Sequence, residues 1–404
     1  MAPLRTVLRD RDAGLYLTAV VVSGFGTSAL WLASGVWVKD LTGSDGLAAL
    51  CLLAMWAPTL LGPLLGTLAD RVRRKPLLIG ANLLLAALLP TLFTVDSADG
   101  LWLLYAVLFV YGAAGVVQDA AESALVAAAV DPSLLGEFNG LRTAITEGMK
   151  LVAPLAGAGL CAAYGGPAVA LLDAGTFVVA TILYAALRVR ESGPGPSRRT
   201  PAAEAVRHLR AHPLLRPLVL AGGITMLFAG LSGAMLYAVI DDLGHSPAYA
   251  GVLYAVQGAG SVVVGLLSGP ALRLLGARRF AAYGIALTAV ATGLRAVPSD
   301  PVALTCAAAS GVGLPCVLIA ALTAVQRETP DALLGRTVTT ANTLVFAPNV
   351  LGLAAGAVLV ELVDQKPLLV VLGGLWLLTA VRLAQRPASA ARTSSRSPSD
   401  ANPA

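Results

Sequence analysis

Charged residues are scarce in this chain. They make up 13% of its 404 residues, about half the share that soluble domains usually carry. Hydrophobic residues make up 57% and run in blocks of about 20, the length that crosses a hydrocarbon core roughly 30 Å thick. The shortage of charge therefore excludes a soluble globular enzyme and predicts a polytopic membrane protein.

Cysteine and histidine are also scarce. Cys51, Cys161, Cys306 and Cys316 lie inside apolar blocks, without a CxxC pair or a histidine nearby, which argues against a zinc site or a disulfide framework. No histidine lies within a predicted span, and neither HExxH nor GxSxG occurs, so a membrane enzyme lacks its reactive groups. The sequence offers no soluble signalling domain, so it does not favour a receptor that lacks transport. We expect no enzyme activity, no metal and no cofactor besides a proton gradient.

Apolar runs between charge clusters predict twelve membrane-spanning helices. They are residues 15–38, 46–67, 77–94, 101–126, 143–164, 167–187, 217–240, 248–272, 279–297, 301–325, 338–360 and 367–384. A backbone in lipid must satisfy its own hydrogen bonds, and apolar runs of this length suit helices rather than ten-residue alternating strands. The sequence therefore predicts an all-α membrane protein.

Basic residues fall almost entirely on one side of this arrangement. If the N-terminus is cytoplasmic, 25 of the 28 Lys and Arg residues lie inside, and three lie outside: Lys39, Arg295 and Lys366. This bias follows the positive-inside rule. Both termini are therefore expected in the cytoplasm, with the chain in the inner or plasma membrane. Because the charge of +5 then reflects topology, we expect the lipid bilayer and no nucleic acid as a partner.

The middle of the chain divides it into two halves. Residues 1–187 and 214–384 each contain six predicted spans, and the basic stretch 188–213 is expected to form a linker with a short helix at the cytoplasmic interface. His208 and His212 in that helix are four residues apart, but no third metal ligand is evident. Residues 385–404 are rich in Ser, Ala, Arg and Pro and are expected to form a disordered tail.

The halves also repeat each other at an offset of 199 residues. Gly112 corresponds to Gly311, and the Ala-Gly-Ala stretch around Gly157 corresponds to the one around Gly356. Matches at a single offset predict a duplicated six-helix unit and two pseudo-symmetric bundles.

The most specific motif lies between the second and third predicted spans. It reads Gly66-Thr-Leu-Ala-Asp70-Arg71-Val-Arg73-Arg74-Lys75. Here the chain resembles the major facilitator superfamily, whose signature in this turn is G-x-L-A-D-R-x-G-R-K. Arg73 replaces the usual glycine. The resemblance covers essentially the whole chain and implies a conformational switch at Gly66, Asp70, Arg71 and Arg74, in which the acid and arginines lock the outward-open state. The alternative is that these charges only set topology.

Within that superfamily, the chain looks most like macrolide-efflux drug:proton antiporters. The stretches that carry this resemblance begin at Asp40, Asp173 and Gln326. It implies export of hydrophobic or amphiphilic drug-like molecules by proton antiport with alternating access, and hence a role in antibiotic resistance. Small-molecule cargo and protons are the expected partners of a monomer. A proton-coupled uptake symporter and an exporter of one endogenous metabolite remain alternatives.

Five charged residues lie more than three positions inside the ends of the predicted spans, all in the first half: Asp119, Glu122, Glu147, Lys150 and Asp173. Such residues are costly in a membrane and are therefore functional candidates. The first four are candidates for proton coupling, and our hypothesis is a proton-exchanging cluster of Asp119, Glu147 and Lys150. The alternative for that cluster is a permanent salt bridge between helices. For Asp173 we expect a packing or capping role.

A cavity for cargo is expected near the midplane, between the halves. In the superfamily, helices 1, 4, 7 and 10 line it, assisted by helices 2, 5, 8 and 11. Residues at suitable depth that break the aliphatic pattern are Thr27, Trp31, Tyr111, Met226, Phe228, Gln257, Asn342, Phe346 and Asn349. A large apolar surface with few polar groups suits hydrophobic, often cationic or polycyclic cargo rather than a sugar.

Overall fold

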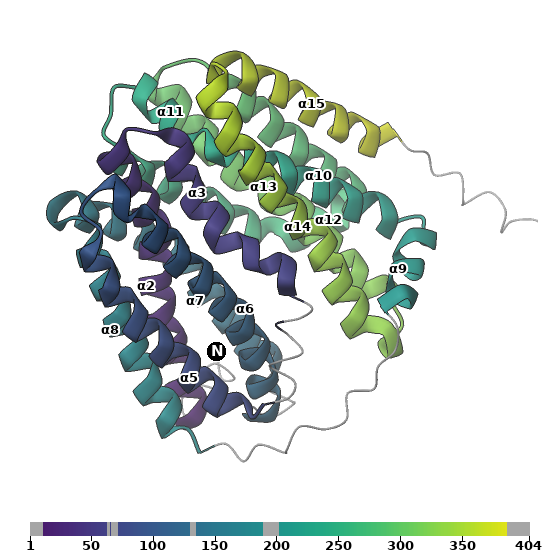
Figure 1. Ribbon diagram of the computed structural model, residues 1–404. Coiled ribbons are helices and arrows are strands. Elements are labelled where there is room, and N and C mark those ends of the chain that lie inside the picture. The colour runs from purple at the N-terminus through teal and green to yellow at the C-terminus, as the bar shows by residue number, and fades with distance from the viewer. Residues whose placement is uncertain (1–10, 63–64, 66–71, 130–134, 189–201, 386–404) are drawn as a thin grey trace, which may run out of the picture.

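A computed structural model describes residues 11–62, 65, 72–129, 135–188 and 202–385 (Figure 1). Within these ranges every regular element is helical. The first half contains α2 (Arg11–Thr42), α3 (Asp45–Trp56), η1 (Ala57–Leu61), α5 (Arg74–Leu88), η2 (Leu89–Thr94), η3 (Ala98–Gly100), α6 (Leu101–Ala129), α7 (Leu135–Tyr164) and α8 (Gly166–Ala186). Then come α9 (Ala202–Ala211), α10 (Leu215–Ala234), α11 (Leu236–Asp242), η4 (Pro247–Tyr249), α12 (Ala250–Leu294), α13 (Asp300–Glu328), α14 (Asp331–Leu362) and α15 (Gln365–Gln385).

The predicted spans correspond to these helices. In the described part of the chain, nine helical segments are long and apolar enough to cross a membrane. One of them, Pro247–Leu294, contains two predicted spans, and the shorter apolar helices Asp45–Leu61 and Val152–Tyr164 account for two more. The fold is therefore that of an all-α membrane protein, consistent with twelve spans.

Local sequence explains where these helices bend. Gly276 has φ 74° and ψ 157° and divides α12 into two limbs, a backbone conformation that glycine adopts without steric cost. Pro58 and Pro90 are the second residues of η1 and η2, where α3 and α5 tighten into 3-10 turns, because proline cannot donate the helical hydrogen bond. The predicted span 217–240 is broken at Met235, between α10 and α11.

Glycines at repeated positions allow close helix crossings in both halves. A Cβ added at Gly157 on α7 would lie 2.7 Å from the Cα of Ala29 on α2, and one at Gly356 on α14 would lie 2.9 Å from the carbonyl oxygen of Leu231 on α10. Only a glycine fits so near another helix's backbone without a shift. The residues that repeat in the sequence therefore make the same kind of contact in each half.

The outer surface is strongly apolar. Leu266, Leu274 and Leu362 are 78%, 85% and 74% exposed, and many other large aliphatic side chains also face outward. An apolar surface of this extent would promote aggregation in water but suits contact with lipid chains. It agrees with a multi-pass membrane protein.

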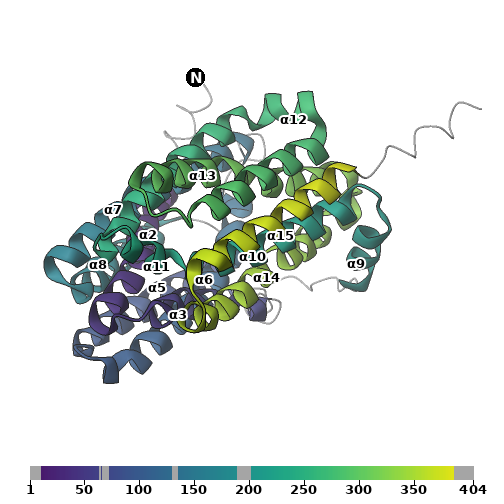
Figure 2. The ribbon, with the colours of Figure 1, turned by 90° about the horizontal axis from the view of Figure 1, so that it is seen from above.

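The two groups of helices meet at one end of the molecule and diverge toward the other (Figure 1). We call the end where Lys39, Asp241 and Glu361 meet the closed end, and the end where α9 and the start of α5 lie the linker end. Helix α9 packs on α10 and α14 at the edge of the second half (Figure 2), with Ala205 and Leu209 buried. The predicted interfacial helix thus uses its apolar face to contact protein.

Candidate functional site

A cavity of about 310 Å³ lies between the two halves. Helices α2, α3 and α7 line it on one side and α12 lines it on the other. The lining residues are Thr27, Ser28, Trp31, Trp56, Pro154, Tyr254, Gln257, Gly258 and Ser261. The volume is at the lower end of the range for small-molecule sites. Three of the predicted cargo residues, Thr27, Trp31 and Gln257, line it.

Three aromatic residues line this cavity, Trp31, Trp56 and Tyr254, and two of them form a contact between the halves. The rings of Trp31 on α2 and Tyr254 on α12 meet edge to face, with centroids 4.8 Å apart. Such pairs add to the stabilisation that apolar burial gives. Sequence reasoning missed Tyr254 and Trp56, because depth along a helix does not reveal which way a side chain faces.

A smaller cavity of about 100 Å³ lies within the second half, beside the first. Tyr254 and Gln257 line both cavities, and the smaller one is also lined by Ser232 and Arg295. The Nη1 atom of Arg295 donates to Ser232 Oγ at 3.3 Å. Arg295 lies near the end of the predicted span 279–297 and was counted among the outward-facing basic residues, so this cation in the interior of the second half was missed.

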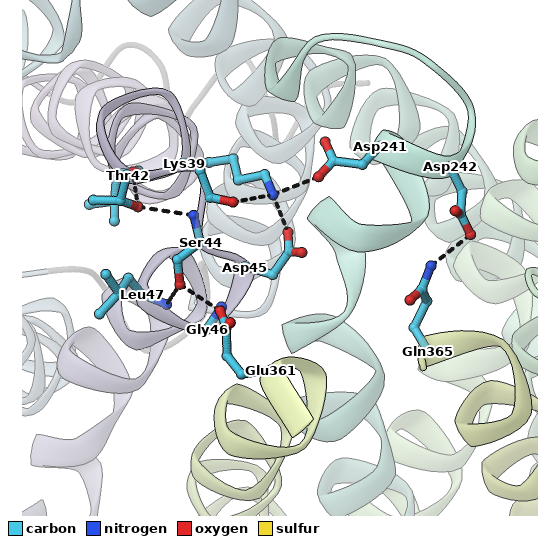
Figure 3. Close-up of polar contacts among 12 residues, drawn as sticks. Lys39, Thr42, Ser44, Asp45, Gly46, Leu47, Asp241, Asp242, Glu361 and Gln365 are labelled. Atoms are coloured by element: carbon cyan, nitrogen blue, oxygen red, sulfur yellow. Dashed lines mark hydrogen bonds and ion pairs between the residues drawn. The ribbon is translucent and has the colours of Figure 1, made fainter. Parts of the chain in front are cut away.

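An ion-pair network joins the halves at the closed end (Figure 3). The ammonium group of Lys39, at the end of α2, lies 2.8 Å from Asp45 Oδ1 and 2.6 Å from Asp241 Oδ2 on α11. It also donates to the carbonyl oxygen of Gly43 at 2.9 Å. The Lys39 side chain is only 6% exposed, so these contacts replace most of its hydration.

A second contact at the closed end involves the N-terminus of α3. Ser44 Oγ and the backbone N–H of Gly46 both donate to Glu361 Oε1 on α14, at 2.5 and 2.7 Å (Figure 3). Ser44 also caps α3 by accepting from the N–H of Leu47. A carboxylate is well placed at a helix N-terminus, where free N–H groups and the helix dipole attract negative charge.

A buried polar network in the first half centres on Asp173. The Tyr111 hydroxyl donates to Asp173 Oδ2 at 2.7 Å and lies 2.8 Å from Thr27 Oγ1, and Thr176 donates to Asp173 Oδ1 at 2.9 Å. Asp173 is fully buried. It lies well inside α8 and therefore caps no helix. Through Tyr111 and Thr27, its carboxyl group is connected to the wall of the larger cavity.

The other ionisable candidates are only partly described. Glu122 accepts hydrogen bonds from the hydroxyls of Tyr16 and Tyr184, at 3.1 and 2.7 Å. Asp119, one turn earlier on α6, is exposed. Glu147 and Lys150 lie on α7, but their side chains lie outside the described residues, so the proposed cluster with Asp119 stays a prediction.

Other predicted cargo residues lie in the helix packing rather than in the lining of these two cavities. In the second half, Phe228 contacts Trp376, Asn349 donates to the backbone oxygen of Met226, and Phe346 packs on the core. Among the described residues, the buried Oδ1 atom of Asn342 has no hydrogen-bond partner. Tyr111 belongs to the Asp173 network.

The turn that carries the family motif is mostly outside the described residues. Gly66, Asp70 and Arg71 fall there, and Arg74 begins α5. Next to it, Lys75 Nζ donates to the backbone oxygens of Ala185 and Leu187 at 2.8 and 2.7 Å. The basic end of the motif therefore ties α5 to the end of α8.

Comparisons with known proteins identify the family. The sequence profile of the Major Facilitator Superfamily matches residues 16–237 and 218–403. The enterobactin exporter EntS of Escherichia coli O1:K1 / APEC is 31% identical over 324 residues, covering 73% of this chain and 71% of that protein. A bacterial homologue of the iron transporter ferroportin, solved in an inward-facing state, has a TM-score of 0.70 and 16% identity, covering 93% and 99% of the two chains. A bacterial homologue of the lysosomal transporter Spinster has a TM-score of 0.66 at 16% identity, covering 93% and 95%. The chain belongs to the Major Facilitator Superfamily and is a multi-pass membrane transporter.

Proposed function

We propose that this transporter exports small amphiphilic molecules by alternating access, coupled to proton entry. The proposal rests on the cavity between the halves, which is lined in part by aromatic residues. The contacts of the closed end, which join the halves, lie a few helical turns from this cavity. A carrier needs a central site and a barrier that can open and close beside it. The first half, 1–187, and the second half, 214–384, would rock about the cavity, joined by the linker 188–213.

The charge distribution supports an orientation for this cycle. Basic residues gather at the linker end, where Arg74 and Lys75 begin α5 and Arg210 lies in α9. Lys39 and Lys366 instead pair with Asp241 and Asp242 at the closed end. By the positive-inside rule, the linker end and both termini face the cytoplasm and the closed end faces outward. The divergence of the helices toward the linker end then corresponds to a state that is open to the cytoplasm.

Proton coupling would use carboxyl groups of the first half. Asp119, Glu122, Glu147 and Lys150 are the proposed group, and the motif residues Gly66, Asp70, Arg71 and Arg74 would act as the conformational switch. Asp173 joins these candidates, because its hydrogen bonds through Tyr111 connect a buried carboxyl group with the cavity wall.

The direction and cargo are proposed from the named relative. Because EntS is an exporter of enterobactin, export is favoured over uptake, and enterobactin is a candidate cargo beside the drug-like molecules suggested by the resemblance to macrolide-efflux antiporters. An efflux-deficient bacterial host expressing the chain should tolerate higher concentrations of some amphiphilic antibiotics, and a protonophore should abolish that tolerance. Unchanged tolerance across antibiotic classes, together with unchanged enterobactin secretion, would contradict export.

A cross-link tests alternating access directly. We expect a short bis-methanethiosulfonate reagent, which forms a reducible disulfide with each of two cysteines and releases methanesulfinate, to join Ser44→Cys to Glu361→Cys across the halves and stop transport in proteoliposomes. A reductant should restore transport. The matched control joins Asp242→Cys to Gln365→Cys, whose side chains are hydrogen-bonded at 2.6 Å at the same end but within the second half (Figure 3). The four native cysteines are buried and give little background. Undiminished transport after the first cross-link would refute the mechanism.

A further inference from the structure

We propose that the smaller cavity is an anion subsite, in which Arg295 and Ser232 hold a negatively charged group of the cargo while the apolar body of the cargo lies in the larger cavity. The inference rests on the proposed function and specifies its substrate class. It replaces the cationic cargo expected from the sequence with an amphiphile that bears a carboxylate or a similar anion.

Arg295 has no acidic partner in the described part of the chain. Its one hydrogen bond to a described residue is to the neutral hydroxyl of Ser232, at 3.3 Å. The acidic residues of the closed end are engaged elsewhere: Asp241 pairs with Lys39, Asp242 with Lys366, and Asp300 with His245. A guanidinium group carries five N–H donors, so most of the donors of Arg295 are available to a ligand.

The position of Arg295 makes an unpaired cation costly. It follows the last residue of α12, yet its side chain turns back into the cavity of the second half, beside Tyr254 and Cys306. Removing a charge from water is expensive unless an opposite charge or several hydrogen bonds compensate for it. An anion entering this cavity would supply that compensation, and a bidentate carboxylate matches the geometry of a guanidinium.

The size and chemistry of the two cavities fit the two parts of such a cargo. The smaller cavity, about 100 Å³, is large enough for a carboxylate with accompanying water. It also offers hydroxyl groups from Thr292 and Ser310. The larger cavity, about 310 Å³, presents the rings of Trp31 and Trp56. Tyr254 and Gln257 border both cavities, so a ligand held there contacts both environments.

A matched set of fluorescent probes tests the charge preference. Dansylglycine, dansylglycinamide and the dansyl derivative of ethylenediamine share one apolar body and carry an anionic, a neutral and a cationic group. Their affinities are measured by dansyl fluorescence with the purified full chain in detergent, without any ion gradient. We expect dansylglycine to bind at least tenfold more tightly than the amide, and the cation to bind most weakly.

Variants then assign the preference to one side chain. Arg295→Gln should remove the tenfold preference while leaving the affinity for the amide within about twofold, and Arg295→Lys should restore part of it. Arg327→Gln, which removes an exposed arginine at the end of α13, is the matched control and should keep the preference. Gel filtration and melting temperature identify variants that fail to fold, and Arg295→Lys then carries the test.

Two results would overturn the inference. One is similar affinity of the wild-type chain for all three probes, or no binding of the anion. The other is an unchanged preference in a folded Arg295→Gln protein. Because binding is measured without transport, either result leaves export by alternating access standing, whereas a failed cross-linking or efflux experiment would count against the proposed function itself.

Discussion

The two halves share a framework of helix crossings but enclose different polar groups. In each half, a repeated glycine meets the backbone of a neighbouring helix, as Gly157 meets Ala29 and Gly356 meets Leu231. The first half also buries the carboxyl group of Asp173, whereas the second half places the guanidinium of Arg295 beside a cavity. The comparison teaches that the shared glycines set the framework, while the enclosed polar residues give each half a separate chemical role.

The largest effect should come from filling a repeated crossing. A Cβ at Gly112 would lie 2.9 Å from the carbonyl carbon of Met55, and one at Gly311 would lie 2.7 Å from that of Gln257. Gly112→Ala and Gly311→Ala should each destabilise the protein by about 3 kcal/mol, because the backbone must shift to admit the methyl group. Melting temperatures in detergent measure this.

Gly115→Ala is the control for that pair. Outside the helix's own backbone, no atom of the described residues lies within 4 Å of a Cβ at this position on α6. Alanine also favours the helix by about 1 kcal/mol relative to glycine. The control should therefore melt no lower than the wild type. If only one of Gly112→Ala and Gly311→Ala lowers the melting temperature, the two halves do not share the crossing as we describe it.

An intermediate effect should distinguish the two interiors. Tyr111→Phe removes the hydroxyl that donates to Asp173 at 2.7 Å, and leaving that buried acceptor without its donor should cost about 1–3 kcal/mol. Thr225→Val likewise leaves the buried N–H of Trp376 without its acceptor, but that bond is neutral and longer, at 3.3 Å. Its loss should cost about 1 kcal/mol, at the low end of the same range. Chemical unfolding of both variants measures the difference. Equal losses would show that the carboxyl network of the first half has no special weight.

The smallest effect should come from the ion pairs that join the halves. Lys39→Gln removes the contact with Asp241, which is 48% exposed, so water screens part of the interaction and the loss should be about 1 kcal/mol. The closed end should then open about fivefold more often. The labelling rate of Ser28→Cys, which lines the cavity, by an impermeant thiol reagent applied from the outer face reports this opening.

Lys366→Gln sharpens that measurement. Lys366 pairs with Asp242 at 3.3 Å, and both residues belong to the second half. Its loss should leave the labelling rate unchanged, because no contact between the halves is removed. A similar rise in both variants would mean that overall charge at the closed end, rather than the contact between halves, controls opening.

Most of the fold could be predicted because its signals are local. Apolar length gives the spans, and glycine and proline give the breaks at Gly276 and at η1 and η2. The division of 217–240 at Met235 carries no comparable local signal and depends on packing around α11. The contact of α9 with the second half also could not be predicted, because an apolar face fits lipid and protein equally well.

The sequence predicted how deep in the membrane the site residues lie, but not which face of each helix they occupy. Thr27, Trp31 and Gln257 were expected at the cavity and line it. Met226 was chosen by the same criterion, yet it is buried in the core of the second half, because the rotation of a helix about its axis is set by contacts with its neighbours. Arg295 was missed since counting loop charges assumes that a side chain follows its backbone into water, whereas a long side chain can turn back into the bundle.

The glycines at the helix crossings form the framework of this carrier, and a different set of residues forms the surface that contacts cargo. Backbone atoms exclude any side chain at Gly311, so this position offers no route to a new selectivity. Gln257 contributes its backbone to that same crossing and also lines both cavities. Substitution there changes the ligand surface and keeps the crossing intact. A carrier built in this way is readily redesigned for another molecule, because a few cavity side chains can be exchanged without rebuilding the bundle.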